Sequence, residues 1–508
     1  MRPVMGILAG LALLCAGAAH AQAGAGIPTV RVKIDSGVVV GVVHEHADVF
    51  RDIPYAAPPV GPLRWRPPQP VQPWAGDRIA LLPGPSCPQP MRADGAPNLG
   101  GANGPTSEDC LQLNVYAPKD ARRAPVMVWI HGGEFQTGAG WIYDGQNFAR
   151  DGVILVTLNY RLGALGYFAP AAIVKAAPAG EPVGDYGQMD QIAALRWVRR
   201  NIAAFGGDPD NVTLFGESAG GMATLDLLAT PAARGLFEKA IVESGLGWFR
   251  PVNLAQAEAA SEARLARAGV PSTATADELR ALPVAKLVAI GGDFEPFVDG
   301  RLMPETATQA LADGHFDDVP LIIGSNSGED SLLGSGPLPP QRVAVFTPAA
   351  ARAAYKPDEA AGEEAFARAV FTDRIMGAPA RWVAAQAWGG KPAWLYHFSY
   401  IGSRFRPAKT RASHADEIQY VFEYWGRRTP MSVVSDEDRR MARLMHACWI
   451  AFAKTGVPAC GGMAWPAYTP AKDQLMEFGP RSGVVAHFRK PELDEADAAV
   501  LPTLGLSK

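Results

Sequence analysis

The chain has 508 residues, of which 48% are hydrophobic and 19% are charged. This balance excludes a disordered, fibrous or repeat protein and indicates a globular chain with a large core. The formal net charge is only -4, and no block of like charges occurs in the sequence. The composition therefore gives no sign of a nucleic-acid partner or a membrane surface as the target.

The first residues predict a signal peptide. Met1 and Arg2 precede an apolar stretch at 4–16, and the sequence Ala-His-Ala at 19–21 fits a cleavage site. We therefore expect a signal peptide at 1–21, a mature chain at 22–508 and export to the periplasm or beyond the cell. Cys15 would suit a lipid-anchored signal, but Leu14 precedes it where a small residue is needed. No later apolar run reaches the roughly 20 residues that span a bilayer, so we expect no membrane anchor.

The cysteines predict at least one disulfide. Of five cysteines, Cys15 falls in the signal, and export permits bridges among the other four. Four cysteines allow three pairings, and the sequence-local choice joins Cys87 to Cys110 and Cys448 to Cys460. The first loop is rich in Pro, Gly and Asn, so a bridge would restrain a segment that packs poorly by itself. Cys448 lies in a helical pattern, where a buried free thiol is equally compatible.

The pattern of apolar residues predicts an α/β fold. Residues 29–55 alternate β-branched and small side chains, which is typical of an N-terminal meander of strands. Further apolar, strand-like runs follow at 126–130, 153–158, 212–215, 240–243, 319–324 and 394–398. Apolar residues at helical spacing occupy 189–202 and 444–454. This alternation predicts a mostly parallel central sheet flanked by helices on both faces.

Two regions interrupt this alternation. Residues 250–315 and 335–390 are rich in alanine and helical in pattern, without clear strands. We expect them to form helical cap insertions over the carboxyl edge of the sheet.

The sequence Gly-Glu-Ser-Ala-Gly at 216–220 predicts a nucleophile. It follows the strand-like run 212–215 and precedes a helical pattern at 221–228, which is the setting of the nucleophile elbow in the α/β-hydrolase fold. Glycines on both sides of Ser218 permit a strained turn that exposes the serine oxygen. The start of the following helix offers backbone N–H groups and a positive dipole end to an oxyanion.

A second glycine turn ends the run 126–130, with the sequence His-Gly-Gly-Glu-Phe at 131–135. Acyl transfer creates a tetrahedral oxyanion, and adjacent small residues let backbone N–H groups point at it. Because the turn precedes the elbow in the expected order, we interpret it as part of an oxyanion hole.

Several longer motifs together resemble the type-B carboxylesterase family, which includes cholinesterases and bacterial para-nitrobenzyl esterases. They are Phe50-Arg-Asp-Ile-Pro-Tyr-Ala56, Pro58-Pro-Val-Gly-Pro-Leu-Arg64, Glu108-Asp-Cys-Leu-Gln-Leu-Asn-Val115, Asn159-Tyr-Arg-Leu-Gly163, Phe205-Gly-Gly-Asp-Pro209 and Phe215-Gly-Glu-Ser-Ala-Gly220. The resemblance implies oxyanion donors at the N–H groups of Gly133, Glu134 and Ala219, a Cys87–Cys110 bridge and a single domain over 22–508. Many relatives carry Gly or Ala at the position of Glu134, so this carboxylate departs from the family pattern.

A serine nucleophile requires a base and an orienting acid. Among the nine histidines, His414 follows the run 394–398, opens a helical stretch at 415–422 and resembles the family's catalytic histidine in its H-x-x-E setting. His44 and His46 are expected on one face of an N-terminal strand, as surface residues rather than metal ligands.

Two neighbouring acids follow the run 319–324, at the sheet edge where catalytic side chains gather. Either Glu329 or Asp330 could reach His414. The resemblance favours Glu329 as the acid, and Asp330 then has the simpler interpretation of a helix N-cap for residue 331 onward.

These residues predict a serine hydrolase that cleaves carboxylic esters through an acyl-enzyme intermediate. We expect small-molecule ester substrates and no metal or organic cofactor. Two alternatives are an amidase or peptidase on the same fold and a non-catalytic binding module of the cholinesterase-like kind. The loop between Cys87 and Cys110 contains no tryptophan to stack on a quaternary ammonium, which disfavours choline esters. The sequence does not determine the substrate, the oligomeric state or the choice between periplasm and medium.

Overall fold

The computed structural model describes residues 27–426 and 429–506. The predicted signal peptide lies outside these residues. None of the helices in the described part of the chain combines the length and apolar character needed to cross a bilayer.

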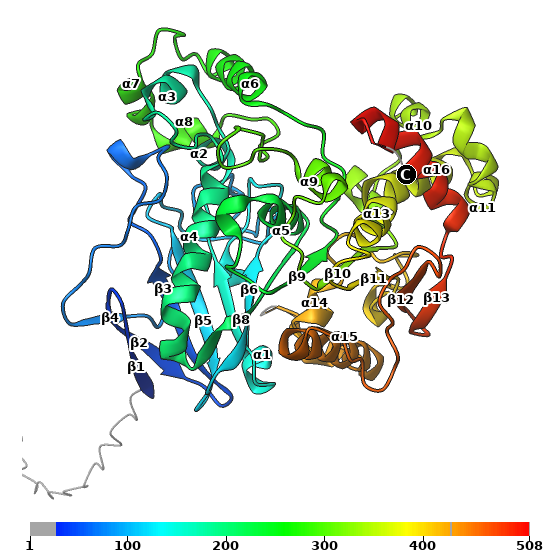
Figure 1. The fold of residues 1–508 in the computed structure, drawn as a ribbon, viewed down its shortest axis with the longest axis horizontal. Coiled ribbons are helices and arrows are strands. Elements are labelled where there is room, and N and C mark those ends of the chain that lie inside the picture. The colour runs from blue at the N-terminus through cyan, green and yellow to red at the C-terminus, as the bar shows by residue number, and fades with distance from the viewer. Residues whose placement is uncertain (1–26, 427–428, 507–508) are drawn as a thin grey trace, which may run out of the picture.

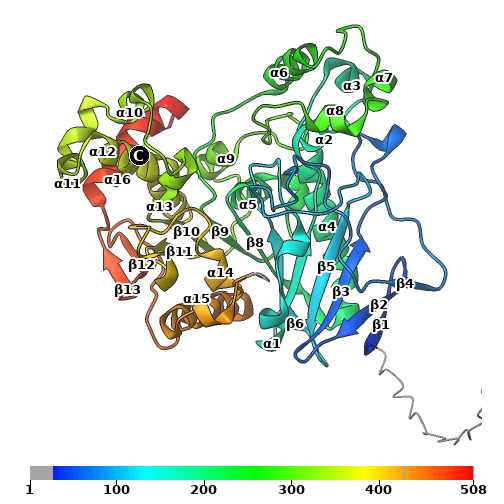
Figure 2. The same ribbon diagram turned by 180° about the vertical axis from the view of Figure 1, so that it is seen from behind.

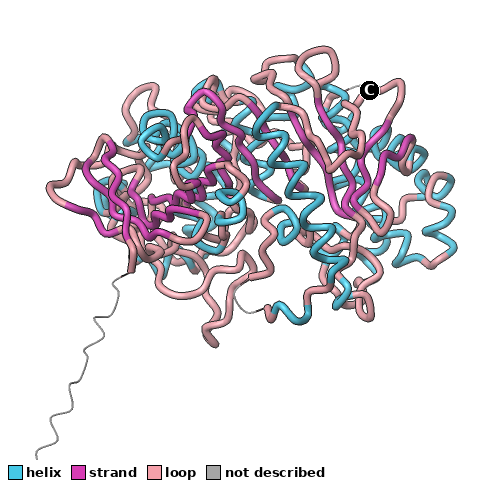
Figure 3. The backbone as a smooth tube through the Cα atoms, turned by 90° about the horizontal axis from the view of Figure 1, so that it is seen from below, coloured by secondary structure: helices cyan, strands magenta, loops and turns pink. Residues whose placement is uncertain are grey.

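One large sheet passes through the molecule, as Figures 1 and 3 show. Its strand order is β1-β2-β3-β5-β7-β6-β8-β9-β10-β11-β12-β13, and the short β4 pairs with β2. The strands are β1 (Thr29–Ile34), β2 (Gly37–Val43), β3 (Ala47–Pro54), β4 (Asp77–Ile79), β5 (Gln112–Pro118), β6 (Ala124–Ile130), β7 (Ile154–Leu158), β8 (Gly207–Glu217), β9 (Lys239–Glu243), β10 (Leu321–Asn326), β11 (Ala393–Phe398), β12 (Gln474–Phe478) and β13 (Gly483–Ala486).

The centre of the sheet is parallel and its two ends are antiparallel. Strands from β7 to β12 pair in parallel. The predicted meander comprises β1, β2 and β3, which pair antiparallel, and β5, which the sequence did not predict, continues it antiparallel to β3 and β7. The carboxyl ends of β8, β10 and β11 therefore meet at one edge. The expectation that His44 and His46 share a strand face was wrong, because both lie in the turn between β2 and β3.

The central strands are apolar throughout because both faces of the sheet are covered. Along β6, Val126, Val128 and Ile130 enter one core, whereas Met127 and Trp129 enter the other. Helices α4 (Tyr186–Asn201), α5 (Ala219–Ala229) and α13 (Ala378–Gln386) supply side chains to the first core. Helices α1 (Gln146–Arg150), α14 (Ile418–Val421) and α15 (Asp436–Thr455) supply the second, and α14 and α15 lie together in Figure 2.

The remaining helices lie in groups on one side of the sheet (Figures 1 and 2). One group contains α6 (Leu254–Arg267), α7 (Ala276–Arg280) and α8 (Val284–Val288), near α2 (Gly163–Gly166) and α3 (Ala171–Ala176). Another contains α10 (Pro340–Phe346), α11 (Lys356–Ala360), α12 (Glu363–Thr372) and α16 (Lys490–Val500), and α9 (Ala307–Asp313) lies between the groups. The two alanine-rich regions are thus helical, as predicted.

Two disulfides are present. Cys87 is bonded to Cys110, which closes the loop between β4 and β5. Cys448 in α15 is bonded to Cys460, so the alternative of a free buried thiol does not hold. Both pairings are the ones that are local in the sequence.

Candidate active site

The turn between β8 and α5 holds Ser218 in an unusual backbone conformation, with φ 57° and ψ -123°. Non-glycine residues rarely adopt such angles, and they persist where the surroundings enforce them. The flanking glycines allow the chain to pack tightly enough to enforce this conformation. A Cβ on Gly220 would lie 2.0 Å from the carbonyl oxygen of Ile130, and a Cβ on Gly216 would lie 2.4 Å from the carbonyl oxygen of Gly220. The tight packing of the turn against β6 therefore requires glycine at both positions.

His414 and Glu329 form a direct pair. Nδ1 of His414 lies 2.6 Å from Oε2 of Glu329, and Glu329 is fully buried in the short 3-10 helix Glu329–Leu333 that follows β10. The other carboxylate oxygen of Glu329 accepts hydrogen bonds from the Ser244 hydroxyl and the Asn326 N–H, both at 2.7 Å. The acid is therefore held in one orientation by β10 and by the end of β9.

The second imidazole nitrogen of His414 faces Glu217. Its Nε2 lies 3.1 Å from Oε1 of Glu217. Ser218 and His414 line the same hollow, but no hydrogen bond joins them within the described residues. Burial by itself would lower the pKa of His414, but the charges of Glu217 and Glu329 outweigh it and raise this pKa to about 10. Both carboxylates therefore favour the imidazolium form of this side chain.

Sequence reasoning missed a further carboxylate near this pair, Glu243, and assigned no role to Glu217 or to Glu417 of the H-x-x-E setting. Burial is the main cause that raises the pKa of Glu217 to about 7 and that of Glu243 to about 8, and it raises the pKa of Glu417 well above its usual range. Glu243 accepts a hydrogen bond from Trp449 Nε1 at 2.8 Å. The available signal was that Glu217 and Glu243 each end a run of buried strand residues, where a carboxylate is unexpected.

The glycine turn after β6 presents free backbone donors beside Ser218. Gly133 has φ 109° and Glu134 has φ 58°, and a Cβ on Gly133 would lie 2.3 Å from the carbonyl oxygen of Thr137. The N–H groups of Gly133 and Glu134 donate no hydrogen bond to any residue in the described ranges. Ala219 is the first residue of α5, where the N–H groups have no partner inside the helix.

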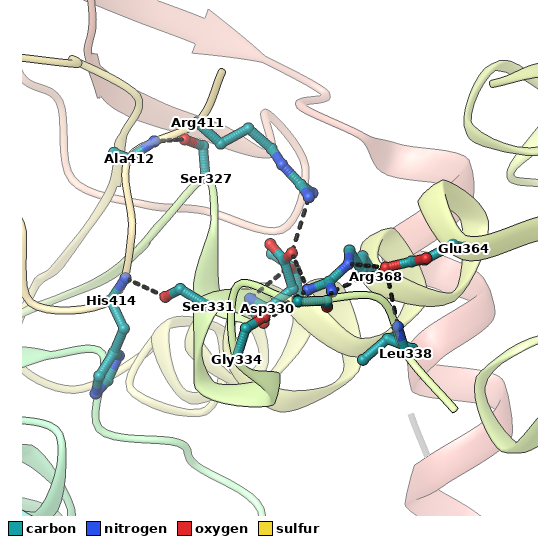
Figure 4. Close-up of polar contacts among 12 residues, drawn as sticks. Ser327, Asp330, Ser331, Gly334, Leu338, Glu364, Arg368, Arg411, Ala412 and His414 are labelled. Carbon is teal, nitrogen blue, oxygen red and sulfur yellow. Dashed lines mark hydrogen bonds and ion pairs between the residues drawn. The ribbon is translucent and has the colours of Figure 1, made fainter. Parts of the chain in front are cut away.

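Asp330, the other candidate acid, does not contact His414. Its carboxylate lies 3.2 Å from Arg368 Nη1 in α12 and 2.9 Å from Arg411 Nη2, as Figure 4 shows. The interpretation of Asp330 as a helix N-cap was wrong, because Gly328 precedes the 3-10 helix and Asp330 lies within it. The two arginines are better partners for a nearly buried carboxylate than a backbone N–H.

This network also fixes the backbone of the histidine loop. The Ser331 hydroxyl accepts a hydrogen bond from the N–H of His414 at 2.9 Å, and the Ser327 hydroxyl accepts one from Ala412 at 2.9 Å (Figure 4). The loop does not open a long helix as expected, because Ala415 has φ 65° and α14 spans only Ile418–Val421.

Four of the six predicted catalytic and oxyanion residues border a hollow of about 670 Å³. Gly133, Glu134, Ser218 and His414 line it, together with Glu217, Leu99, Ile142, Tyr143, Leu332 and Tyr424. A hollow of about 320 Å³ adjoins it, with Leu99, Glu134 and Thr137 common to both. Another hollow, of about 510 Å³ beside α4, contains none of the predicted catalytic residues.

Two groups of side chains elsewhere have the composition of a metal site, Asp151 with Glu423 and His446, and Glu305 with Asp313 and His315. In the first group, Asp151 pairs with His446 at 3.1 Å and with Arg150 at 2.6 Å. These ion pairs explain the buried histidine as part of the packing between α1 and α15.

The mostly parallel sheet, its flanking helices and the strand-turn-helix around Ser218 define the α/β-hydrolase fold. The sequence profile of the carboxylesterase family matches residues 28–343 and 344–495. The chain is 36% identical over 464 residues to the para-nitrobenzyl esterase of Bacillus subtilis, covering 86% of this chain and 92% of that protein. It is 35% identical over 487 residues to the fumonisin B1 esterase of Sphingopyxis macrogoltabida, covering 88% and 86%.

Solved structures agree with these sequence matches. The carboxylesterase of Geobacillus stearothermophilus superimposes with a TM-score of 0.80 at 32% identity, and the match covers 92% of this chain and 99% of that one. The chain therefore belongs to the carboxylesterase family, and it is a carboxylic ester hydrolase.

Proposed function

We propose that the protein hydrolyses carboxylic esters of small molecules in two steps, with Ser218 as nucleophile, His414 as general base and Glu329 as the orienting acid. His414 takes the proton of Ser218 as its oxygen attacks the ester carbonyl, and the collapse of the tetrahedral intermediate releases the alcohol and leaves an acyl-enzyme. Water, deprotonated by His414, then releases the carboxylic acid and restores the serine.

Glu329 holds the imidazole in one tautomer and stabilises the imidazolium that forms in each step. The N–H groups of Gly133, Glu134 and Ala219 stabilise the oxyanion. Ser218 and His414 line the same hollow. Catalytic hydrogen bonds are often long in unliganded proteins and tighten only when substrate is bound.

The single observation that carries this proposal is the 2.6 Å contact between the buried Glu329 and Nδ1 of His414, which lines the same hollow as Ser218. A fluorophosphonate probe tests it, since such probes phosphonylate only activated serines. We expect peptide mapping to find the adduct on Ser218. Ester turnover should fall in proportion to the fraction of Ser218 that is labelled. An adduct elsewhere, or full turnover by the labelled protein, would contradict the assignment.

The names of the relatives refer to different esters, so the fold does not identify the physiological substrate of this chain. A substrate screen is needed to find it. Turnover of aryl, short-chain, long-chain and hydroxycinnamoyl esters by the purified mature protein would rank them. Matched ester and amide substrates would show whether amide cleavage accompanies ester cleavage.

We also infer that residues 22–508 form one domain and that the protein is exported. The first inference is supported by a sheet whose strands come from both ends of the described chain. The second is supported by two disulfides, which persist in oxidising compartments.

A further inference from the structure

Glu134 occupies an exposed position beside the proposed nucleophile. It follows Gly133 in the oxyanion turn, and its side chain lines both the hollow of about 670 Å³ that contains Ser218 and the adjoining hollow of about 320 Å³. No hydrogen bond or ion pair to its carboxylate occurs among residues 27–426 and 429–506. Glu134 is one of three residues common to both hollows, so a bound molecule that extends from Ser218 into the second hollow passes near it.

The other charges that line the two hollows are already paired within the described residues. In the larger hollow, Glu217 lies 3.1 Å from His414. In the smaller one, the guanidinium of Arg92 lies 2.8 Å from Asp94. The remaining lining residues are neutral, so Glu134 is the one carboxylate of the described walls that has no partner among the described residues.

This charge affects the proposed reaction directly. The transition state develops an oxyanion beside the backbone of residue 134, and a carboxylate on the same residue raises the free energy of that oxyanion by Coulomb repulsion. A positively charged substrate group placed near Glu134 offsets this repulsion and gains a charge-assisted hydrogen bond when it carries N–H donors.

We propose that Glu134 is a specificity-determining residue, and that it selects esters carrying a primary ammonium group close to the scissile carbonyl over neutral and anionic esters of the same shape. This inference rests on the proposed function, because it assumes that Ser218 is the nucleophile. It differs from recognition of quaternary ammonium by aromatic rings, since a carboxylate gains a charge-assisted hydrogen bond only from a cation that carries N–H donors.

The test compares Glu134→Gln with the unchanged protein on three esters of similar shape, whose group near the carbonyl is ammonium, uncharged or carboxylate. One series carries this group on the acyl side and another carries it on the alcohol side. In at least one series, we expect kcat/KM in the variant to fall about 2- to 5-fold for the ammonium ester and to rise by a similar factor for the carboxylate ester, with the uncharged ester between them. This dependence of the change in kcat/KM on substrate charge should weaken in high salt, because the site is open to solvent.

Glu45→Gln is the matched control, because it removes an exposed carboxylate from the turn between β2 and β3, at the far end of the sheet. This variant should leave the ratios of kcat/KM among the three esters unchanged. If Glu134→Gln alters every ester in both series equally, Glu134 acts through shape alone and the inference is wrong. The proposed function fails separately, if Ser218→Ala still turns over the uncharged ester.

Discussion

Nε2 of His414 lies 3.1 Å from Oε1 of Glu217, the residue that immediately precedes Ser218 in the chain. The proposed base is thus held between two carboxylates, with Glu329 on its other nitrogen at 2.6 Å. Both negative charges favour the imidazolium form, which explains why the pKa of His414 is raised despite burial. The resting base is therefore protonated at a pH where an isolated histidine would be neutral.

We predict that Glu217→Gln moves the acid limb of the pH profile of kcat/KM to lower pH, by about one pH unit. Only neutral His414 can accept the proton of Ser218, and a raised pKa delays its deprotonation until higher pH. Removing one of the two charges lowers this pKa, so the neutral form appears earlier. The plateau should also fall, because the imidazolium of the transition state loses a stabilising carboxylate.

Initial rates measured between pH 5 and 10 with an uncharged ester would show this shift. Glu243→Gln serves as control, because Glu243 is buried in the same region but hydrogen-bonds to Trp449 rather than to His414. An unchanged acid limb in Glu217→Gln would mean that the contact seen here does not persist in solution.

Ser218→Ala should fold normally and lose ester turnover. The residual rate from the oxyanion hole alone should be orders of magnitude below that of the unchanged protein. Circular dichroism and thermal unfolding check the fold, and active-site titration checks for contaminating enzyme. Retention of more than a few per cent of kcat would exclude Ser218 as nucleophile.

Glu329→Gln and Asp330→Asn should differ strongly in their effects. The first keeps the shape of the acid but removes the charge that stabilises the imidazolium, and the analogous change in a serine protease lowers kcat about 10,000-fold. The second leaves the contact with His414 intact but weakens the contacts with Arg368 and Arg411, so it should lower stability, by roughly 2 kcal/mol or more.

Steady-state kinetics and denaturant unfolding of both variants separate the two roles. Arg411→Gln is a useful companion to Asp330→Asn, because it removes a partner of the same carboxylate without altering the acid turn. If kcat falls more in Asp330→Asn than in Glu329→Gln, the assignment of the acid is wrong.

Replacing Cys87 and Cys110 together by serine should destabilise the protein by roughly 2 to 5 kcal/mol. The bridge closes the loop that contains Leu99, which lines both hollows, so KM should also rise. Unfolding in denaturant and ester kinetics measure the two effects. The matched Cys448 and Cys460 double replacement should change stability with little effect on KM, because that bridge does not line either hollow.

Much of the fold followed from the sequence. Each of the six apolar runs chosen as strands corresponds to a strand, because strands buried on both faces must be apolar throughout. The strand-turn-helix around Ser218 could be predicted as well, since glycine at 216 and 220 is the only residue that the close approach to β6 permits. These features depend on local chain chemistry, which a sequence displays directly.

The surroundings of the proposed base were decided only by tertiary structure. Glu217, Glu243 and Glu329 are far from His414 in the chain, and their approach to it depends on which strands are neighbours in the sheet. The role of Asp330 also changed, because Arg368 and Arg411 reach it from α12 and from the histidine loop. A carboxylate in a sequence has no fixed partner, and its partner and its pKa are set by the distances and burial that folding creates.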